Sequence, residues 1–337
     1  MVLAGLLHDG RAEPQCAAPV RIIFDTDMAG DCDDAGALAV LHALADRGEC
    51  EILAVTTNRK DLTGASAAAV DAINHWYGRP NIPIGTDKKG GATSTPPKSS
   101  YTEALRDNFP NKAKADCDMP DALEVCRKVL AGAPDKSVVV CCVGALSNLE
   151  DLLKNEYELV ERKVKQLVVM AAEFPDSRKN QPETNIRVDI PAAKYAIENW
   201  PSDILFTGFE VGFMIHAGSA LQMAPPNNPV RRAYELRPYN GIPSLEKGKP
   251  AYDQTAVLLA VRGTQKCYWT VVRGGRVEVD SEDGHTRWLK DSISRHAWVK
   301  IKGDPQSLTD LIDQMMVEPP AKKAQTPMEY SSDSAQR

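Results

Sequence analysis

The 337-residue sequence predicts an α/β fold with a mainly parallel central sheet flanked by helices. Short runs rich in β-branched residues, such as 21–24 and 137–143, alternate with longer Ala- and Leu-rich segments of helical length. Strand–helix–strand units at this spacing lie parallel in one sheet, because each intervening helix crosses a face of the sheet.

The expected elements follow one another through most of the chain. Strands are expected at 21–24, 51–57, 82–85, 137–143, 164–171 and 203–207. Helices are expected to open at 35–41 and to cover 64–76, 121–130, 146–154, 191–199 and 307–317. The Gly274-Gly275 pair between the β-rich runs of 268–279 predicts a hairpin.

The domain organisation is expected to be simple. Residues 1–19 read as an N-terminal extension, either disordered or the remnant of a signal sequence, and 20–318 as a single α/β domain. The Pro-, Lys- and Ser-containing segment 319–337 is expected to be a disordered tail. Residues 86–100 are rich in Gly, Lys, Ser, Thr and Pro, which favours a loop or a mobile lid.

Composition narrows the class of partner. A net charge of −6 without a long basic run argues against nucleic acid, and no apolar stretch has the length of a membrane span. The eight cysteines form no C-x-x-C pair, which argues against a zinc site and a disulfide framework. Reduced thiols favour a cytoplasmic protein, although a secreted or periplasmic location stays open.

An acidic loop is the most informative motif. Five carboxylates lie between Asp25 and Asp34, directly behind an apolar strand and before a helix. This places them at the carboxyl end of a strand, where open α/β sheets bind ligands. Two like charges 4 Å apart repel by about 4 kcal/mol at an effective dielectric near 20. A hard divalent cation would relieve that repulsion, although Asp33 and Asp34 would also suit a helix N-terminus without any metal.

Three further segments offer polar groups that could join the same site. Gly144 follows a strand and would allow close backbone approach, which leaves the Val143 carbonyl free, although this segment alone fits an ordinary tight turn better. Glu183 and Asn185 suit a hydroxyl-rich ligand or a solvated loop. Asp253 opens an apolar helix and could act as its cap or as a ligand.

Taken in order, these motifs resemble the inosine–uridine nucleoside hydrolase family, over roughly residues 20–265. The shared features are the acidic loop, Thr-Thr at 56–57, Gly-Ala-Leu-Ser-Asn at 144–148, Glu-Thr-Asn at 183–185 and Tyr-Asp-Gln at 252–254. The family reads Asp-x-Asp-x-x-x-Asp-Asp-Ala in the loop. This chain keeps the start and the end of that pattern with two extra residues between, so the matching acids are Asp27, Asp33 and Asp34.

The resemblance implies a calcium-dependent hydrolase that cleaves the N-glycosidic bond of ribonucleosides or related ribosides, an activity of nucleoside salvage. It implies Ca²⁺ ligands in the carboxylates of Asp27, Asp34 and Asp253 and the carbonyl of Val143, an all-oxygen set. It also implies Asp33 as general base. The expected ribose contacts are Glu183, Asn185 and Asn58, with Asp61 as a substitute for Asn58. A small-molecule nucleoside is the expected partner, and a homo-oligomer is the expected assembly.

The chain departs from the family pattern at the leaving group. Tyr252 stands where purine-acting members have a histidine that helps to protonate the departing base. A phenol with a pKa of about 10 is a poorer acid than imidazolium at neutral pH. Tyr252 would still donate a hydrogen bond, and Tyr234 or Tyr239 could assist. Residues 86–110 bear no likeness to the corresponding loop of the family, so the sequence predicts no base specificity.

Two other functions stay open on the sequence. The first is a calcium-dependent sugar- or nucleoside-binding protein with little or no turnover, which the loss of the histidine at Tyr252 would suit. The second is a haloacid-dehalogenase-like phosphatase, because Asp25-Thr26-Asp27 after a strand resembles the nucleophile and acid of that family. That motif expects a hydroxyl residue where this chain has Ala29.

Overall fold

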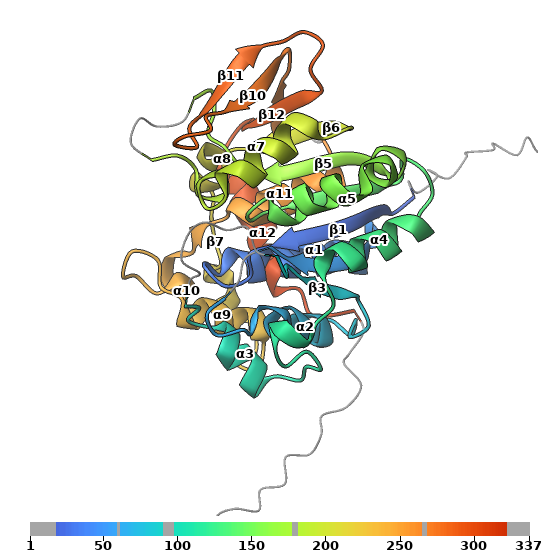
Figure 1. Cartoon of the computed structure of the whole chain (residues 1–337). Coiled ribbons are helices and arrows are strands. Elements are labelled where there is room, and N and C mark those ends of the chain that lie inside the picture. The colour runs from blue at the N-terminus through green and yellow to red at the C-terminus, as the bar shows by residue number, and fades with distance from the viewer. Residues whose placement is uncertain (1–17, 59–60, 90–97, 177–180, 265–267, 322–337) are drawn as a thin grey trace, which may run out of the picture.

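An eight-stranded sheet forms the centre of the computed structural model, which describes residues 18–58, 61–89, 98–176, 181–264 and 268–321 (Figure 1). The strand order is β3-β2-β1-β4-β5-β6-β12-β9. Neighbours pair in parallel, except that β9 runs antiparallel to β12. The strands are β1 (Val20–Thr26), β2 (Cys50–Thr57), β3 (Ile84–Thr86), β4 (Val138–Cys142), β5 (Val164–Met170), β6 (Asp203–Thr207), β9 (Trp269–Val272) and β12 (His296–Ile301).

Helices cover both faces of this sheet. In β1, Ile22 and Phe24 pack into one apolar layer and Ile23 into the other, as expected for a strand that is buried on both sides. The helices of the first layer are α1 (Asp33–Asp46), α2 (Ser66–Trp76), α11 (Tyr252–Arg262) and α12 (Pro305–Val317). Those of the second layer are α4 (Ala122–Gly132), α5 (Ser147–Lys163) and α7 (Ile190–Asn199). The predicted fold class is confirmed.

The connections diverge between β1 and β4. From β1 the chain proceeds outward to β2 and β3, whereas β4, β5 and β6 extend the sheet in the opposite direction. In open α/β sheets, ligands bind outside the carboxyl ends of the strands at such a switch point, the region that we call the crevice. The acidic loop follows β1 and Gly144 follows β4, so both predicted segments border this crevice.

The remaining elements are short and lie around this core. They are α3 (Thr102–Asn108), α6 (Thr184–Arg187), α8 (Phe209–Phe213), α9 (Pro229–Leu236), α10 (Ser244–Lys247), the pair β7 (His216–Ala217) and β8 (Lys249–Pro250), and the 3-10 helices at Asp116–Asp118 and Ser219–Met223. The hairpin of β10 (Gly275–Val279) and β11 (Thr286–Lys290) lies at one end of the molecule (Figure 1).

The hairpin predicted around Gly274-Gly275 is wrong. The strand before it, β9, pairs with β12 in the central sheet, whereas the strand after it, β10, pairs with β11. Gly274 has a φ of +81°, a left-handed conformation that suits glycine, and the chain leaves the central sheet there instead of folding back on β9.

The N-terminal residues 1–17, most of the predicted tail (322–337) and the middle of the predicted lid (90–97) lie outside the described residues. Before the tail, the backbone N–H of Ala321 donates to Asp46 over 2.9 Å, and Glu318 pairs with Arg47. Among the helices that are described, none has the length and apolar character needed to cross a membrane.

Candidate functional site

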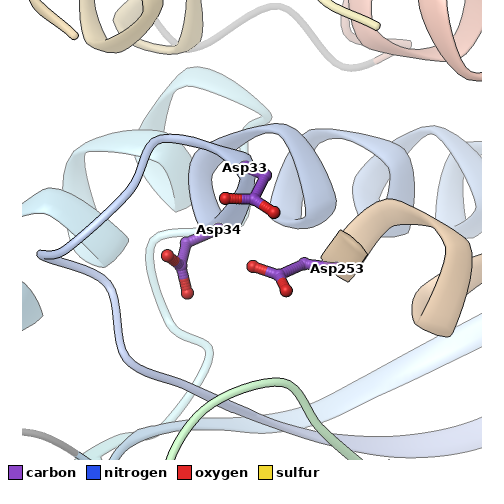
Figure 2. A group of neighbouring side chains, drawn as sticks. All are labelled: Asp33, Asp34 and Asp253. Carbon is purple, nitrogen blue, oxygen red and sulfur yellow. The ribbon is translucent and has the colours of Figure 1, made fainter. Parts of the chain in front are cut away.

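Three buried carboxylates from two helices meet at the crevice. Asp33 and Asp34 occupy the first turn of α1, and Asp253 occupies the first turn of α11. One carboxylate oxygen of each residue lies within 4.8 Å of one oxygen of each of the others. All three residues are buried, with at most 4% of their surface exposed. Figure 2 shows the three carboxylates turned toward a common space. The packing of α1 against α11 thus brings together acids that are distant in the sequence.

The electrostatics of this cluster are unfavourable without a cation. Burial, followed by repulsion from Asp27 and Asp33, raises the pKa of Asp34 well above its ordinary value. Burial, followed by repulsion from Asp33, Asp34 and Asp27, also raises the pKa of Asp253 well above its ordinary value. Within the described chain, Asp33 Oδ2 is buried and has no hydrogen-bond partner. An oxygen-only donor set with excess negative charge and an unsatisfied oxygen fits a hard divalent cation such as calcium.

A buried lysine lies against one side of the cluster. The Nζ atom of Lys249 lies 2.5 Å from Asp33 Oδ1 and 2.6 Å from Asp31 Oδ1, and the Lys249 side chain is only 1% exposed. Burial alone would lower the pKa of Lys249, but Asp33 and Asp31 outweigh it and raise the pKa above its ordinary value. Lys249 therefore stays charged. Nothing in the sequence marks Lys249 as buried, because an isolated lysine ordinarily lies at the surface.

Asp25 lies beneath the cluster and is saturated with donors. Its carboxylate accepts hydrogen bonds from Thr56 Oγ1 at 2.5 Å and from the side-chain amides of Asn58 and Asn148 at 2.8 Å. Burial raises the pKa of Asp25 to about 6, against these hydrogen bonds, which lower it. Both oxygens of Asp25 are engaged by these donors, which argues against Asp25 as the nucleophile that the phosphatase alternative needs.

Asp27 and Gly144 bring the loops after β1 and β4 into contact. A Cβ atom added to Gly144 would lie 2.8 Å from both N and Cβ of Asp27, so only glycine fits this approach. The same Cβ would also overlap Asn58 Oδ1, which is buried without a hydrogen-bond partner among the described residues. Asp27 is partly buried, and its charge acts on Asp34 and Asp253. Asp27 and Asn58 therefore border the same space as the three carboxylates.

Glu183 and Asn185 hold backbone groups beside this space. Glu183 caps α6 by accepting from the N–H groups of Asn185 at 2.9 Å and Ile186 at 3.2 Å, and burial raises its pKa to about 7. The Asn185 side-chain amide donates to the carbonyls of Val143 at 2.9 Å and Met170 at 3.0 Å. The Val143 carbonyl oxygen keeps a second lone pair.

Asp61 is engaged elsewhere. It accepts hydrogen bonds from Thr102 Oγ1 at 2.6 Å and from the Ser99 N–H at 3.2 Å, and it also binds Thr63. These contacts hold Ser99, at the end of the 86–100 segment, and the start of α3, so the structure gives Asp61 a role in the loop instead of at the crevice.

Aromatic side chains lie beside the acids at the start of α11. Tyr252 is half-buried, and its ring centroid lies 5.2 Å from that of Phe209, which also stacks on the half-exposed Phe213 at 5.4 Å. Burial raises the pKa of Tyr252, so its phenol stays protonated. Two further tyrosines were expected to assist. Tyr234 is fully buried, and its hydroxyl accepts a hydrogen bond from Gln254 Nε2 at 2.8 Å. The ring centroid of Tyr239 lies 6.1 Å from that of His216.

Comparison with known proteins gives one family and one fold. The model of the family "inosine-uridine preferring nucleoside hydrolase" matches residues 22–305. A purine-preferring ribonucleoside hydrolase from Gardnerella vaginalis has a similar structure, with a TM-score of 0.68, 18% identity, and coverage of 88% of this chain and 98% of that one. An inosine-uridine preferring nucleoside hydrolase from Bacillus anthracis is also similar. Its TM-score is 0.65 at 14% identity, over 88% of this chain and 99% of that one.

A third similar structure is the type III effector protein XopQ complexed with adenosine diphosphate ribose. Its TM-score is 0.63 at 15% identity, over 90% of this chain and 94% of that one. No curated protein sequence matches the chain. At these identities the solved structures establish a shared fold.

Proposed function

Because the chain belongs to the inosine-uridine preferring nucleoside hydrolase family, we propose that it uses calcium to hydrolyse the N-glycosidic bond of ribonucleosides or related ribosides. The observation that supports this most is the convergence of Asp33, Asp34 and Asp253 at the carboxyl end of the sheet. Acids that are far apart in the sequence are buried together there. Burial of like charges destabilises the fold unless they hold a cation.

The residues that would hold the ion are Asp27, Asp34 and Asp253 through their carboxylates and Val143 through its carbonyl. Bound there, calcium would supply positive charge for a water molecule and for the ribose hydroxyls. All four donors are oxygens: Asp27 and Val143 belong to the segments after β1 and β4, and Asp34 and Asp253 to the first turns of α1 and α11. This donor chemistry supports calcium over zinc, which takes nitrogen or sulfur ligands more readily.

Asp33 is the proposed general base, and its two oxygens differ. Oδ1 is held by Lys249 at 2.5 Å, whereas Oδ2 is buried without a partner in the described structure, so Oδ2 is the atom that would accept a proton from water. Burial raises the pKa of Asp33, and Lys249 opposes part of this shift. The net rise brings the basicity of Asp33 closer to neutral pH, as a general base requires.

Glu183, Asn185 and Asn58 are the proposed ribose contacts. Asn58 Oδ1 supports this role best, because it is a buried acceptor that lacks a donor among the described residues. Glu183 and Asn185 already bind backbone groups, so they would contact the sugar through their remaining lone pairs. Negative charge on Glu183 would favour the positive charge that develops on ribose as the N-glycosidic bond breaks.

Tyr252 is the proposed leaving-group residue. Because burial raises the pKa of its phenol, Tyr252 would donate a hydrogen bond to the departing base without transferring the proton completely. Its neighbours Phe209 and Phe213 offer aromatic surface for a planar base. Both features favour an aromatic aglycone.

The direct test is the release of free ribose from a panel of purine and pyrimidine ribonucleosides in the presence of calcium. We expect ribose from at least one nucleoside and at least about a hundredfold lower rate for D33N, the range expected for loss of a general base. The matched control is D203N, which neutralises an exposed acid at the start of β6. A calcium-loaded protein that releases no ribose from the whole panel would contradict the hydrolase proposal.

The second candidate function is a calcium-dependent sugar- or nucleoside-binding protein with little or no turnover. The engagement of Glu183 and Asn185 by backbone groups and the tyrosine at 252 favour it. Calorimetry of the wild type with ribose and with inosine separates the two functions. Binding that needs calcium, is only weakened in D33N, and yields no product over long incubation supports the binding protein.

A further inference from the structure

Lys249 is an unusual component of this site. Its ammonium group is buried and contacts two carboxylates, Asp31 and Asp33, of the acidic loop. In the part of the chain that the structure describes, no lysine or arginine lies within ion-pair distance of Asp34 or Asp253. Among the described residues, the positively charged partners of the cluster therefore lie on its Asp31 and Asp33 side, and none pairs with Asp34 or Asp253.

The backbone holds Lys249 in this place. Lys249 lies in β8, which pairs with β7 so that Ala217 is opposite Lys249. Gly248, just before it, has a φ of +68°, and a Cβ there would lie 2.9 Å from the Ala217 carbonyl oxygen. The tight approach of β7 and β8 thus depends on glycine, and it fixes the backbone from which Lys249 reaches Asp31 and Asp33.

A second cation lies at the rim, beside Asp31. Arg237 Nε donates to the Gly30 carbonyl at 3.1 Å and lies 4.0 Å from Asp31 Oδ1, but its side chain is 41% exposed. Asp31 is itself 39% exposed, so solvent and Arg237 moderate its charge. Asp33 depends on Lys249 much more, because its side chain is only 3% exposed.

We propose that Lys249 is a positioning residue for the divalent ion. Its ammonium group occupies the Asp31 and Asp33 side of the cluster. It thereby confines calcium to the side of Asp34 and Asp253. This inference rests on the proposed function, since it assumes that calcium is the ion. The ammonium pairs with Asp33 Oδ1, fixes the orientation of that carboxylate and leaves Oδ2 directed away from the pair. It also repels a metal ion that would otherwise use Asp33 as a ligand.

The proposal predicts opposite effects for the two members of the pair. K249M removes a positive charge beside the ion and frees Asp33, so calcium should bind at least about tenfold more tightly. D33N leaves the ammonium without its buried partner, so calcium should bind at least about tenfold more weakly. The double variant D33N/K249M removes a neutral pair and should return the affinity to within about threefold of wild type.

The experiment is calcium titration by calorimetry of the wild type, the two single variants and the double variant, with folding checked by circular dichroism. The matched control is K247M, which removes an exposed lysine two residues away and should change the affinity by less than about twofold. If K249M does not fold, D33N and D33N/K249M are compared, and removal of the lysine should still tighten calcium binding by at least about threefold.

Two results distinguish the failure of this proposal from failure of the proposed function. Calcium that binds the wild type but is weakened by both D33N and K249M would overturn the assignment, because a purely structural pair loses affinity on either change. A wild type that binds no calcium would overturn both the proposed function and this assignment, because the assignment assumes that calcium is the ion at the cluster.

Discussion

His42 gives a quantitative prediction about the stability of α1, the helix that presents Asp33 and Asp34. His42 is fully buried, stacks on Tyr77 with ring centroids 4.5 Å apart, and lies 2.9 Å from Asn74 Oδ1. Burial, reinforced by the nearby Arg79 guanidinium, lowers the pKa of His42 to about 3. The imidazole of His42 is therefore neutral in the folded protein at pH 5 and above.

The consequence follows from proton binding in the two states. In the unfolded chain the pKa of His42 returns to about 6.5, so below that pH the unfolded state binds a proton that the folded state excludes. Stability from this residue is fully present above pH 6.5 and is lost as the pH falls toward 3. At about 1.36 kcal/mol per pH unit, the loss between pH 7 and pH 5 is about 2 kcal/mol of unfolding free energy.

The assay is urea denaturation of the wild type and H42Q at pH 7 and pH 5, without calcium. Glutamine retains an amide donor for Asn74 but does not titrate, whereas all carboxylates titrate alike in both proteins. The wild type should lose about 2 kcal/mol more than H42Q on acidification. An equal loss in the two proteins would refute the assignment of a neutral, buried His42.

Three further predictions concern the crevice. G144A should lower calcium affinity at least about tenfold and lower the free energy of unfolding by about 1 to 3 kcal/mol, because the new Cβ must displace Asp27. An unchanged calcium affinity by calorimetry and an unchanged stability by urea unfolding would count against this contact. Y252F should lower kcat for nucleoside hydrolysis at least about tenfold and leave the calcium affinity within about twofold, as steady-state kinetics and calorimetry can show; an unchanged kcat would exclude Tyr252 from the leaving-group step. Calcium at a hundredfold excess over Kd should stabilise the protein by about 2.7 kcal/mol and EGTA should reverse this, whereas equal thermal unfolding in both solutions would argue against a specific ion.

The sequence predicted the layers of the fold because the signal for each early element is local. Buried strands such as β1 and β4 are continuous apolar runs, and their order along the chain implies parallel pairing. The region after residue 268 was interpreted wrongly because the partner of an edge strand depends on distant residues. β9 pairs with β12, some thirty residues later, and nothing around Gly274 encodes that choice.

The predictions for the site differ in kind. The acidic loop and Gly144 were apparent from residue type and position, because carboxylates after a strand and a glycine before a helix have direct structural meanings. Lys249 had no such signal, since its burial arises only when β8 approaches α1 across the fold. The capping role of Glu183 was likewise hidden, because the same carboxylate suits a helix N-terminus and a sugar.

The central claim is that acids from α1 and α11 enclose one hard cation. Its most direct test is calcium calorimetry of the wild type, D34N, D253N and the exposed control D203N. We predict one calcium ion per chain, at least about tenfold weaker binding in D34N and in D253N, and unchanged binding in D203N. Absence of calcium binding by the wild type, or affinities in D34N and D253N equal to that of D203N, would contradict the account.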